Sequence, residues 1–347
     1  MVRSRWVLPL ALCCLSLSLF SQEKSSEKSI TLLGFGDVNL GRAVGQRILK
    51  GQLGFPFIHV RDSLKKAQAV FVNLESQLTD QGGVTQDPKD NLVFCGPPAG
   101  GRSLREANIT VVSTANNHAY DYRLDGVRET IANLDSAGVA YSGTSRDSTS
   151  LFSPAIIDLG VLRIGFVAYT QFVNGKRGWA GHIAIFDERR ARREIGELRR
   201  HVDLVVASFH GGSEYADRPG RTTRRQMRSL IDAGADIVIG HHPHYVQGIE
   251  LYEGKLIFYS LGNFVFYQPQ REWSQRGLGV EIRISMSGGK PTVERVRLLP
   301  LRAGLQPSFS LTDAEQSMII DRVAELSNVR IEEISGLWLV QVRDETE

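Results

Sequence analysis

Three histidines stand at positions 241, 242 and 244, in the stretch GHHPH, although the chain has only eight histidines in all. Imidazole rings crowded into so short a segment would repel one another if each carried a proton. A metal ion binds the neutral form of the ring and so removes this conflict. The spacing of His241, His242 and His244 therefore favours a metal site.

Four further polar clusters stand where apolar, strand-like runs end. In open α/β sheets, ligands bind beyond the carboxyl ends of the strands, so side chains from distant loops can converge on one site. The clusters are Asp37 with Asn39, Asn73 with Glu75, Asn116-Asn117-His118 with Asp121, and His210 with Glu214.

These clusters offer carboxylates, amide oxygens and imidazoles, and no thiolate. That set suits divalent Mn, Fe or Zn, and it contains enough groups for two ions. Each cluster also has a structural interpretation. Asp37 could cap a helix, the asparagines could form a turn, and His210 could be a core histidine. Glu75 is harder to explain in this way, because an unpaired buried carboxylate is costly.

The elements that must position these residues alternate between strand and helix, which predicts an α/β fold with helices packed on a sheet. After residue 245 two hairpins, turning at Glu253-Gly254 and Gly288-Gly289, predict antiparallel strands, and a late helix is expected at 312–327. The expected strands are 30–37, 69–75, 109–118, 163–170, 202–210 and 236–244, and the expected helices are 57–67, 123–138, 187–201 and 222–235.

The composition and the N-terminus indicate an exported globular protein. The formal net charge of +3 over 347 residues is too small for a general nucleic-acid binder. Residues 1–21 are typical of a signal peptide, with two arginines before an apolar run at 7–20, and 22–29 of a polar linker. The alternative is an uncleaved membrane anchor at 7–20. Periplasm, cell envelope and extracellular space all remain open as locations.

The cysteine count limits which covalent links and metal sites the mature chain can form. Two of the three cysteines lie inside the expected signal, which leaves Cys95 alone. An intramolecular disulfide and a cysteine-based metal cluster are then excluded. Cys95 is predicted to be a small buried apolar residue.

Six ordered motifs resemble the bacterial capsule-synthesis protein family typified by CapA, also called PgsA. They are GFGDVNLGR, FVNLESQLTD, STANNHAYDYRLDG, HGGSEY, IGHHPHYVQGIE and YSLGNFVF. The resemblance implies a four-layer α/β/β/α sandwich of the metallophosphoesterase type. The motifs cover most of residues 30–270. We expect a CapA-type domain at 30–303 and a helical C-terminal appendage at 304–347, either a cap or an interaction surface.

The resemblance also implies roles for individual residues around two divalent ions. Asp37 and His244 would bind the first ion, and Glu75 would bridge the pair. Asn117, His210 and His242 would bind the second ion. His118, oriented by Asp121, would protonate the leaving group. The residues expected to line the substrate site are Asn39, Asn73, Asn116, Glu214, His241 and Asn263.

The function implied is capsule or poly-γ-glutamate biosynthesis with a hydrolase-type site. The expected partners are an anionic cell-surface polymer or a phosphate ester, and a capsule-synthesis membrane complex. One alternative is a secreted phosphoesterase of the nucleotidase kind. Another is a non-catalytic polymer-binding scaffold, favoured by Asn39 and Ala119, which stand where the wider superfamily has a histidine and an acidic residue. The arginine-rich helices at 187–201 and 222–235 are either solvated faces or contacts for an anionic polymer.

Overall fold

The computed structural model describes residues 29–147, 153–174 and 177–342. The expected signal peptide at 1–21 and residues 22–28 of the expected linker lie outside this range. Ser29, assigned to the linker from the sequence, is instead the first residue of β1. No helix in the described part of the chain is long and apolar enough to cross a membrane.

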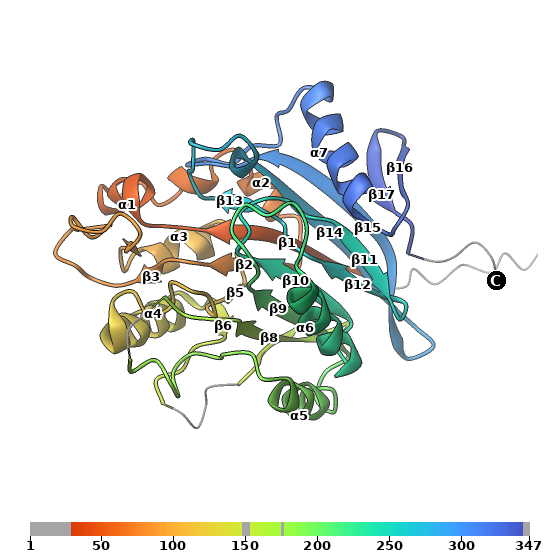
Figure 1. The fold of residues 1–347 in the computed structure, drawn as a ribbon, viewed down its shortest axis with the longest axis horizontal. Helices are drawn as coiled ribbons and strands as arrows, with labels where there is room; N and C mark the ends of the chain where they lie inside the picture. Colours follow the sequence, from red (N-terminus) through yellow and green to blue (C-terminus); the bar gives the residue numbers. More distant parts are fainter. Residues whose placement is uncertain (1–28, 148–152, 175–176, 343–347) are drawn as a thin grey trace, which may run out of the picture.

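Two large sheets and a small one are formed by the described residues (Figure 1). The nine-stranded sheet has, in spatial order, β16 (Ile331–Ile334), β17 (Leu337–Val340), β15 (Lys290–Arg302), β14 (Arg276–Ser287), β1 (Ser29–Val38), β2 (Ala69–Leu74), β5 (Val111–Ser113) and β6 (Ala140–Ser142), with β13 (Asn263–Val265) also paired to β1. The six-stranded sheet has β11 (Ile249–Tyr252), β12 (Lys255–Phe258), β10 (Ile237–His241), β9 (Leu204–His210), β8 (Arg163–Thr170) and β7 (Ala155–Asp158). The small sheet pairs β3 (Gln77–Leu78) with β4 (Cys95–Gly96).

The two large sheets pack face to face, and this packing explains the apolar run at 69–72 in β2. Successive side chains of a strand point to opposite faces. Ala69 and Phe71 therefore join the core between the sheets, together with Phe166 of β8. Val70 and Val72 face the other way, into a core covered by helices. Both faces of the strand are buried, so no polar alternation appears in the sequence.

Helices cover the outer faces of both sheets. The nine-stranded sheet is covered by α1 (Arg42–Leu49), α2 (Arg61–Leu64), α3 (Gly100–Glu106) and α4 (Arg123–Ala137), with a 3₁₀ turn at Phe55–Phe57. The six-stranded sheet is covered by α5 (Glu188–Leu198) and α6 (Arg221–Asp232). Their order, helix, sheet, sheet, helix, confirms the predicted four-layer α/β/β/α sandwich.

The stripe of buried residues on α5 shows how this covering arises from the sequence. Ala191, Ile195 and Leu198 recur at helical spacing and are buried against the sheet. Asp187 caps the helix by accepting a hydrogen bond from the backbone N–H of Arg190 at 2.8 Å. Most of the remaining positions, many of them arginine, are exposed.

The C-terminal part differs from the expected helical appendage. Thr312 and Glu315 form a capping box, and α7 (Asp313–Leu326) follows as predicted. The chain then forms the hairpin of β16 and β17, which pairs with β15 and extends the large sheet (Figure 1). Ile319, Ile320 and Val323 of α7 are buried in the core between the sheets. Residues 313–340 therefore share the core of the sandwich.

Candidate metal and catalytic site

The carboxyl ends of parallel strands from both sheets meet at one edge of the sandwich. β1, β2 and β5 run parallel in the first sheet, and β8, β9 and β10 run parallel in the second. The polar clusters follow the ends of these strands. Gly36 allows the close approach there, because a Cβ at this position would lie 1.8 Å from the carbonyl oxygen of Gly262.

Asp37 is fully buried and joins the two sheets at this edge. Its Oδ2 lies 3.3 Å from Nδ1 of His244 and accepts a hydrogen bond from the backbone N–H of His242 at 3.4 Å. Its Oδ1 accepts from Asn73 at 2.8 Å and lies 3.3 Å from Nδ1 of His241. Burial alone would raise the pKa of Asp37, but His241 and His244 hold that pKa well below its usual range. Asp37 is therefore ionised.

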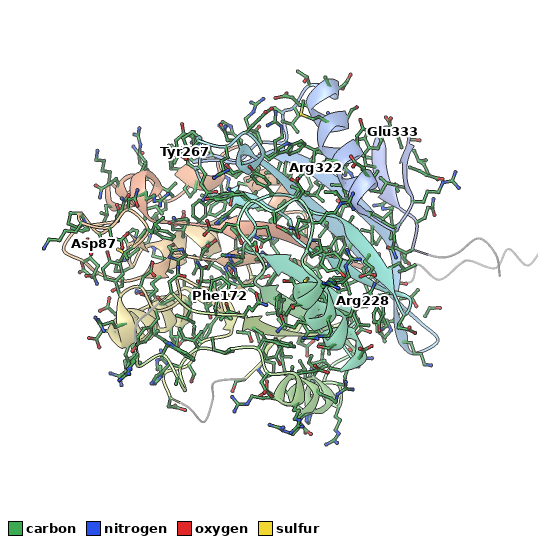
Figure 2. The ribbon with its side chains drawn as sticks, in the orientation of Figure 1. Asp87, Phe172, Arg228, Tyr267, Arg322 and Glu333 are labelled. Carbon is green, nitrogen blue, oxygen red and sulfur yellow. The ribbon has the colours of Figure 1, made fainter. Side chains whose placement is uncertain are left out.

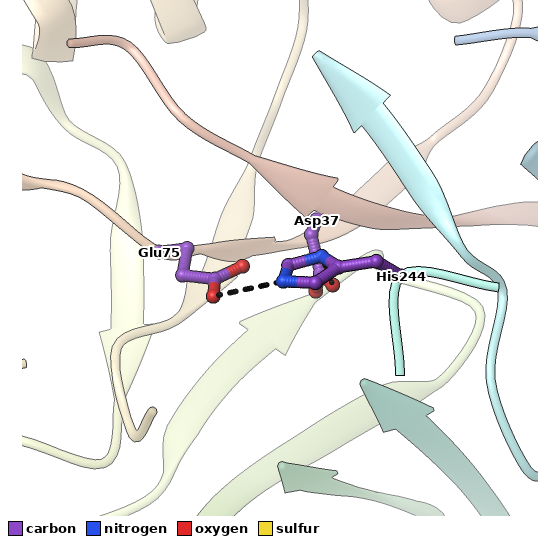
Figure 3. Close-up of side chains that lie close together, drawn as sticks. All are labelled: Asp37, Glu75 and His244. Atoms are coloured by element: carbon purple, nitrogen blue, oxygen red, sulfur yellow. Dashed lines mark ion pairs between the residues drawn. The ribbon is translucent and has the colours of Figure 1, made fainter. Parts of the chain in front are cut away.

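Glu75 lies beside Asp37 and His244 (Figure 3), with its Oε1 3.9 Å from Nε2 of His244. Within the described residues, neither carboxylate oxygen of Glu75 has a hydrogen-bond partner, although the side chain is 1% exposed. Burial and the neighbouring Asp37 raise the pKa of Glu75 well above its usual range. One ligand atom from each of Asp37, Glu75 and His244 lies within 4.8 Å of the others.

The loop that carries His242 and His244 is backbone-strained. Their φ angles are 97° and 56°, in the left-handed region that residues other than glycine rarely adopt. Such strain costs about 1–3 kcal/mol per residue and concentrates at functional sites.

Burial lowers the pKa of His244, but Glu75 and Asp37 raise it to about 9. Burial and His244 lower the pKa of His242 to about 3.

A second group of candidate metal ligands, His210, His242 and Asn117, lies beside the first. Nε2 of His210 donates to Oδ1 of Asn117 at 2.8 Å, and Nδ1 of His210 accepts from Asn73 at 3.3 Å. The rings of His210 and His242 have centroids 4.9 Å apart. Nδ1 of His242 is buried and has no hydrogen-bond partner among the described residues. Burial, and then His242, lower the pKa of His210 well below its usual range, so the ring is neutral.

His118 and Asp121 form a hydrogen-bonded dyad next to these donors. Nδ1 of His118 donates to Oδ2 of Asp121 at 2.8 Å, which leaves Nε2 for other chemistry. Asn116 positions the dyad, because its Oδ1 accepts from the backbone N–H of His118 at 3.1 Å. The ring of Phe94 packs on His118 at a centroid distance of 4.3 Å.

The residues expected to line the substrate site mostly hold other side chains in place. Asn39, Asn73, Asn116, His241 and Asn263 are each at most 4% exposed. Asn39 accepts a hydrogen bond from the N–H of Gly41 at 2.8 Å, and Asn263 accepts from Nδ1 of His244 at 2.9 Å. His241 packs on Phe71, in the core between the sheets. Glu214 is exposed, and its charge contributes to the raised pKa of Glu75.

Residues 31–268, well over half of the chain, match the family model of the bacterial capsule synthesis protein PGA_cap. The chain belongs to this family. Its CapA-type relatives include the PGA biosynthesis protein CapA of Bacillus subtilis (strain 168), 33% identical over 67% of this chain and 62% of that protein. The capsule biosynthesis protein CapA of Bacillus anthracis is 29% identical over 71% of this chain and 62% of that protein. The match thus spans less than two thirds of either relative's length.

Among solved structures, the calcineurin-like phosphoesterase YfkN from Bacillus subtilis is similar at 12% identity and a TM-score of 0.43. The comparison covers 86% of this chain and 97% of that one.

The donor set of this PGA_cap family member fits a divalent ion. A fully buried carboxylate without a partner costs several kcal/mol, and an ion at Glu75 removes that cost. Carboxylate oxygen and imidazole nitrogen are ligands for Mn, Fe and Zn. Asp37, Glu75 and His244 can therefore hold a metal ion together.

The aromatic frame of the site was not predicted from the sequence. Phe266 packs on His244 at a centroid distance of 5.0 Å, and Phe172, labelled in Figure 2, meets His242 edge-on at 5.0 Å. An isolated phenylalanine in a sequence is indistinguishable from an ordinary core residue. Only the position of Phe266 inside the motif YSLGNFVF gave a signal.

Adding Mn²⁺ to chelator-treated protein is expected to stabilise the fold, because Glu75 gains a partner. At a free metal concentration about 100 times Kd, linkage predicts a gain of about 2.7 kcal/mol in the free energy of unfolding. Urea unfolding with and without EDTA measures it. Glu75→Gln should lose most of the gain, whereas Glu325→Gln, at an exposed side chain, should keep it. An unfolding curve of the wild type that EDTA leaves unchanged contradicts the metal site.

Proposed function

We propose that this protein is an exported, metal-dependent hydrolase of the phosphoesterase type that acts in the synthesis, export or processing of a cell-surface polymer. The observation that carries the proposal is the meeting of Asp37, Glu75 and His244 beside the His118–Asp121 dyad. The names of the relatives, which refer to capsule and PGA biosynthesis, support the polymer context. Residues 1–21 support export, and an anchor at 7–20 would retain the protein at the membrane.

Two divalent ions fit the donors in two groups. Asp37, Glu75 and His244 would hold the first ion, and His210, His242 and Asn117 would hold the second. Bound there, the ions would supply Lewis-acid chemistry, activating water and offsetting negative charge on the phosphoryl oxygens.

The protein's own residues supply the proton chemistry. Asp121 fixes the orientation of His118 by accepting a hydrogen bond from Nδ1. A proton on Nε2 of His118 can then pass to the departing oxygen, a contribution of about 10²–10⁴ in rate. Burial of the dyad, with His118 6% exposed, keeps water from competing for that proton.

Turnover of bis(p-nitrophenyl) phosphate by the Mn²⁺-loaded protein tests the proposal. Activity is expected with Mn²⁺, and EDTA is expected to abolish it reversibly. A panel of nucleotides and of γ-glutamyl p-nitroanilide separates a nucleotidase or an amide hydrolase from the proposed activity. Metal-loaded protein without turnover on any ester or amide supports the non-catalytic scaffold instead.

A surface for an anionic polymer is proposed on α5 and α6, which share one outer face of the sandwich (Figure 1). Some arginines there have acidic partners, such as Arg228 (labelled in Figure 2), which pairs with Glu250. Six exposed arginines of α5 and α6 form no ion pair within the described residues: Arg189, Arg192, Arg193, Arg221, Arg224 and Arg225. Unpaired cations of this density attract a polyanion electrostatically.

Binding to poly-γ-glutamate is expected to weaken steeply as NaCl rises toward 1 M, where the screening length falls to about 3 Å. The triple variant Arg192→Glu, Arg193→Glu, Arg225→Glu should lose binding. A matched triple variant on the opposite helical layer, Lys65→Glu, Lys66→Glu, Arg102→Glu, should retain it. Sedimentation or light scattering measures both, and salt-insensitive binding contradicts the surface.

A further inference from the structure

Arg42 places a positive charge against two aromatic residues that pack on the candidate site, and it has no acidic partner within the described residues. One terminal nitrogen donates to the carbonyl oxygen of Asn91 at 2.7 Å. Nε is buried and has no hydrogen-bond partner within the described residues. No carboxylate of the described chain forms an ion pair with it, unlike Arg199, which pairs with Asp236 on another face. The guanidinium therefore has unused donor capacity.

Two aromatic rings connect Arg42 to the residues of the site. Its guanidinium carbon lies 4.9 Å from the ring centroid of Phe94 and 5.8 Å from that of Phe266. Phe94 packs on His118, and Phe266 packs on His244, the two sides of the site. Burial lowers the pKa of Arg42, and the neighbouring Glu75 opposes that shift. Arginine stays charged even so.

The backbone fixes this position at the cost of strain. Arg42 has φ 50°, in the left-handed region. Its N–H donates to the carbonyl oxygen of Thr85 at 2.8 Å, and its carbonyl oxygen accepts from Oγ1 of Thr85 at 2.9 Å. Gly41 is required before it, because a Cβ there would lie 2.7 Å from the carbonyl oxygen of Cys95. A strained, doubly anchored backbone under a charged side chain is typical of a functional residue.

We propose that Arg42 binds an oxyanion of the substrate beside the metal ligands. A guanidinium presents a planar fork of N–H donors that matches two oxygens of a phosphate or a carboxylate. The rings of Phe94 and Phe266 hold the fork in place through cation–π contacts. The inference rests on the proposed function and adds the residue that recognises the substrate's charge.

Binding of inorganic phosphate to Mn²⁺-loaded protein, measured by isothermal titration calorimetry, tests the inference. Arg42→Gln is expected to weaken phosphate binding by about 10- to 100-fold, the usual worth of hydrogen bonds to a charged group. Arg42→Lys keeps the charge but loses the planar fork, so its phosphate affinity should lie between those of the wild type and Arg42→Gln. A second arm with acetate shows whether phosphate or carboxylate loses more affinity, and so which group Arg42 recognises.

Arg47→Gln is the matched control, because Arg47 lies exposed on the same helix and stacks on Phe55 away from the site. It should bind both anions as the wild type does. Unchanged anion binding in Arg42→Gln, with metal content equal to that of the wild type, overturns the inference, as does a metal-loaded wild type that binds neither anion. Both of these results leave the proposed metal site standing. A wild type that takes up no metal overturns the proposed function, and Arg42 is then judged by the same comparison on the metal-free protein.

Discussion

Asp37→Ala is expected to remove bound metal and to reduce phosphodiester hydrolysis by more than about 100-fold. Loss of a residue that only supports a ligand costs about 10- to 100-fold in metal affinity, and Asp37 is itself a candidate ligand. It is also the residue that meets His242 and His244 from the opposite sheet. Elemental analysis of the purified protein and a rate assay with Mn²⁺ measure the two effects.

Two variants separate loss of metal from loss of fold. Asp37→Asn keeps the shape of the side chain, and its Oδ1 can still accept from Asn73. It should therefore fold while binding less metal. Asp62→Ala removes the same charge from a side chain that is 92% exposed, and it should behave as the wild type. Metal content in Asp37→Ala equal to that of the wild type would defeat the assignment.

His118→Ala is expected to lower kcat by about 10²–10⁴ while the metal content stays unchanged. The reason is that His118 is placed as a proton donor, with Nδ1 bound to Asp121 and Nε2 left for the leaving group. The loss should be larger for an alkyl phosphoester than for a p-nitrophenyl ester, because p-nitrophenolate departs without a proton. Steady-state rates on both substrates measure the difference.

Asp121→Asn should lower kcat less than His118→Ala, since the imidazole remains but is less firmly oriented. His201→Ala removes an exposed imidazole in the turn after α5 and serves as the control. An equal loss on both substrates would show that His118 does not donate the proton. A parallel loss of metal would make it a ligand instead.

The predicted elements were most accurate where apolar runs are buried on both sides, as in β2 and β9. The expected helix at 57–67 is in fact a 3₁₀ turn at 55–57 followed by the short α2. Phe57, Val60 and Leu64 are buried in one core cluster, so the periodicity was real. Two short turns give these residues the same spacing as one continuous helix would. Only packing against the sheet decided between the two forms.

Two helices and one hairpin were not predicted. α1 and α3 contain glycines, at Gly45, Gly100 and Gly101, which weaken a helical pattern in sequence. Both pack tightly on neighbouring segments: a Cβ at Gly45 would lie 2.7 Å from Thr85, and one at Gly101 would lie 2.6 Å from the carbonyl oxygen of Asn133. The hairpin of β16 and β17 is formed against β15, and isolated hairpins are marginal without such a partner.

The sequence by itself determined which chemistry is available and at which strand ends it stands. Residues after parallel strands lie at one edge whatever the details of packing, so Asp37, Glu75 and the histidines of GHHPH could be assigned to a shared edge. Only the tertiary structure decided how the two sheets meet there. The contact between Asp37 and His242 spans 205 residues, and no local pattern sets the register between two packed sheets. The same packing gave Arg42 its place, because the rings of Phe94 and Phe266 come from distant parts of the chain and meet its guanidinium only in the folded protein.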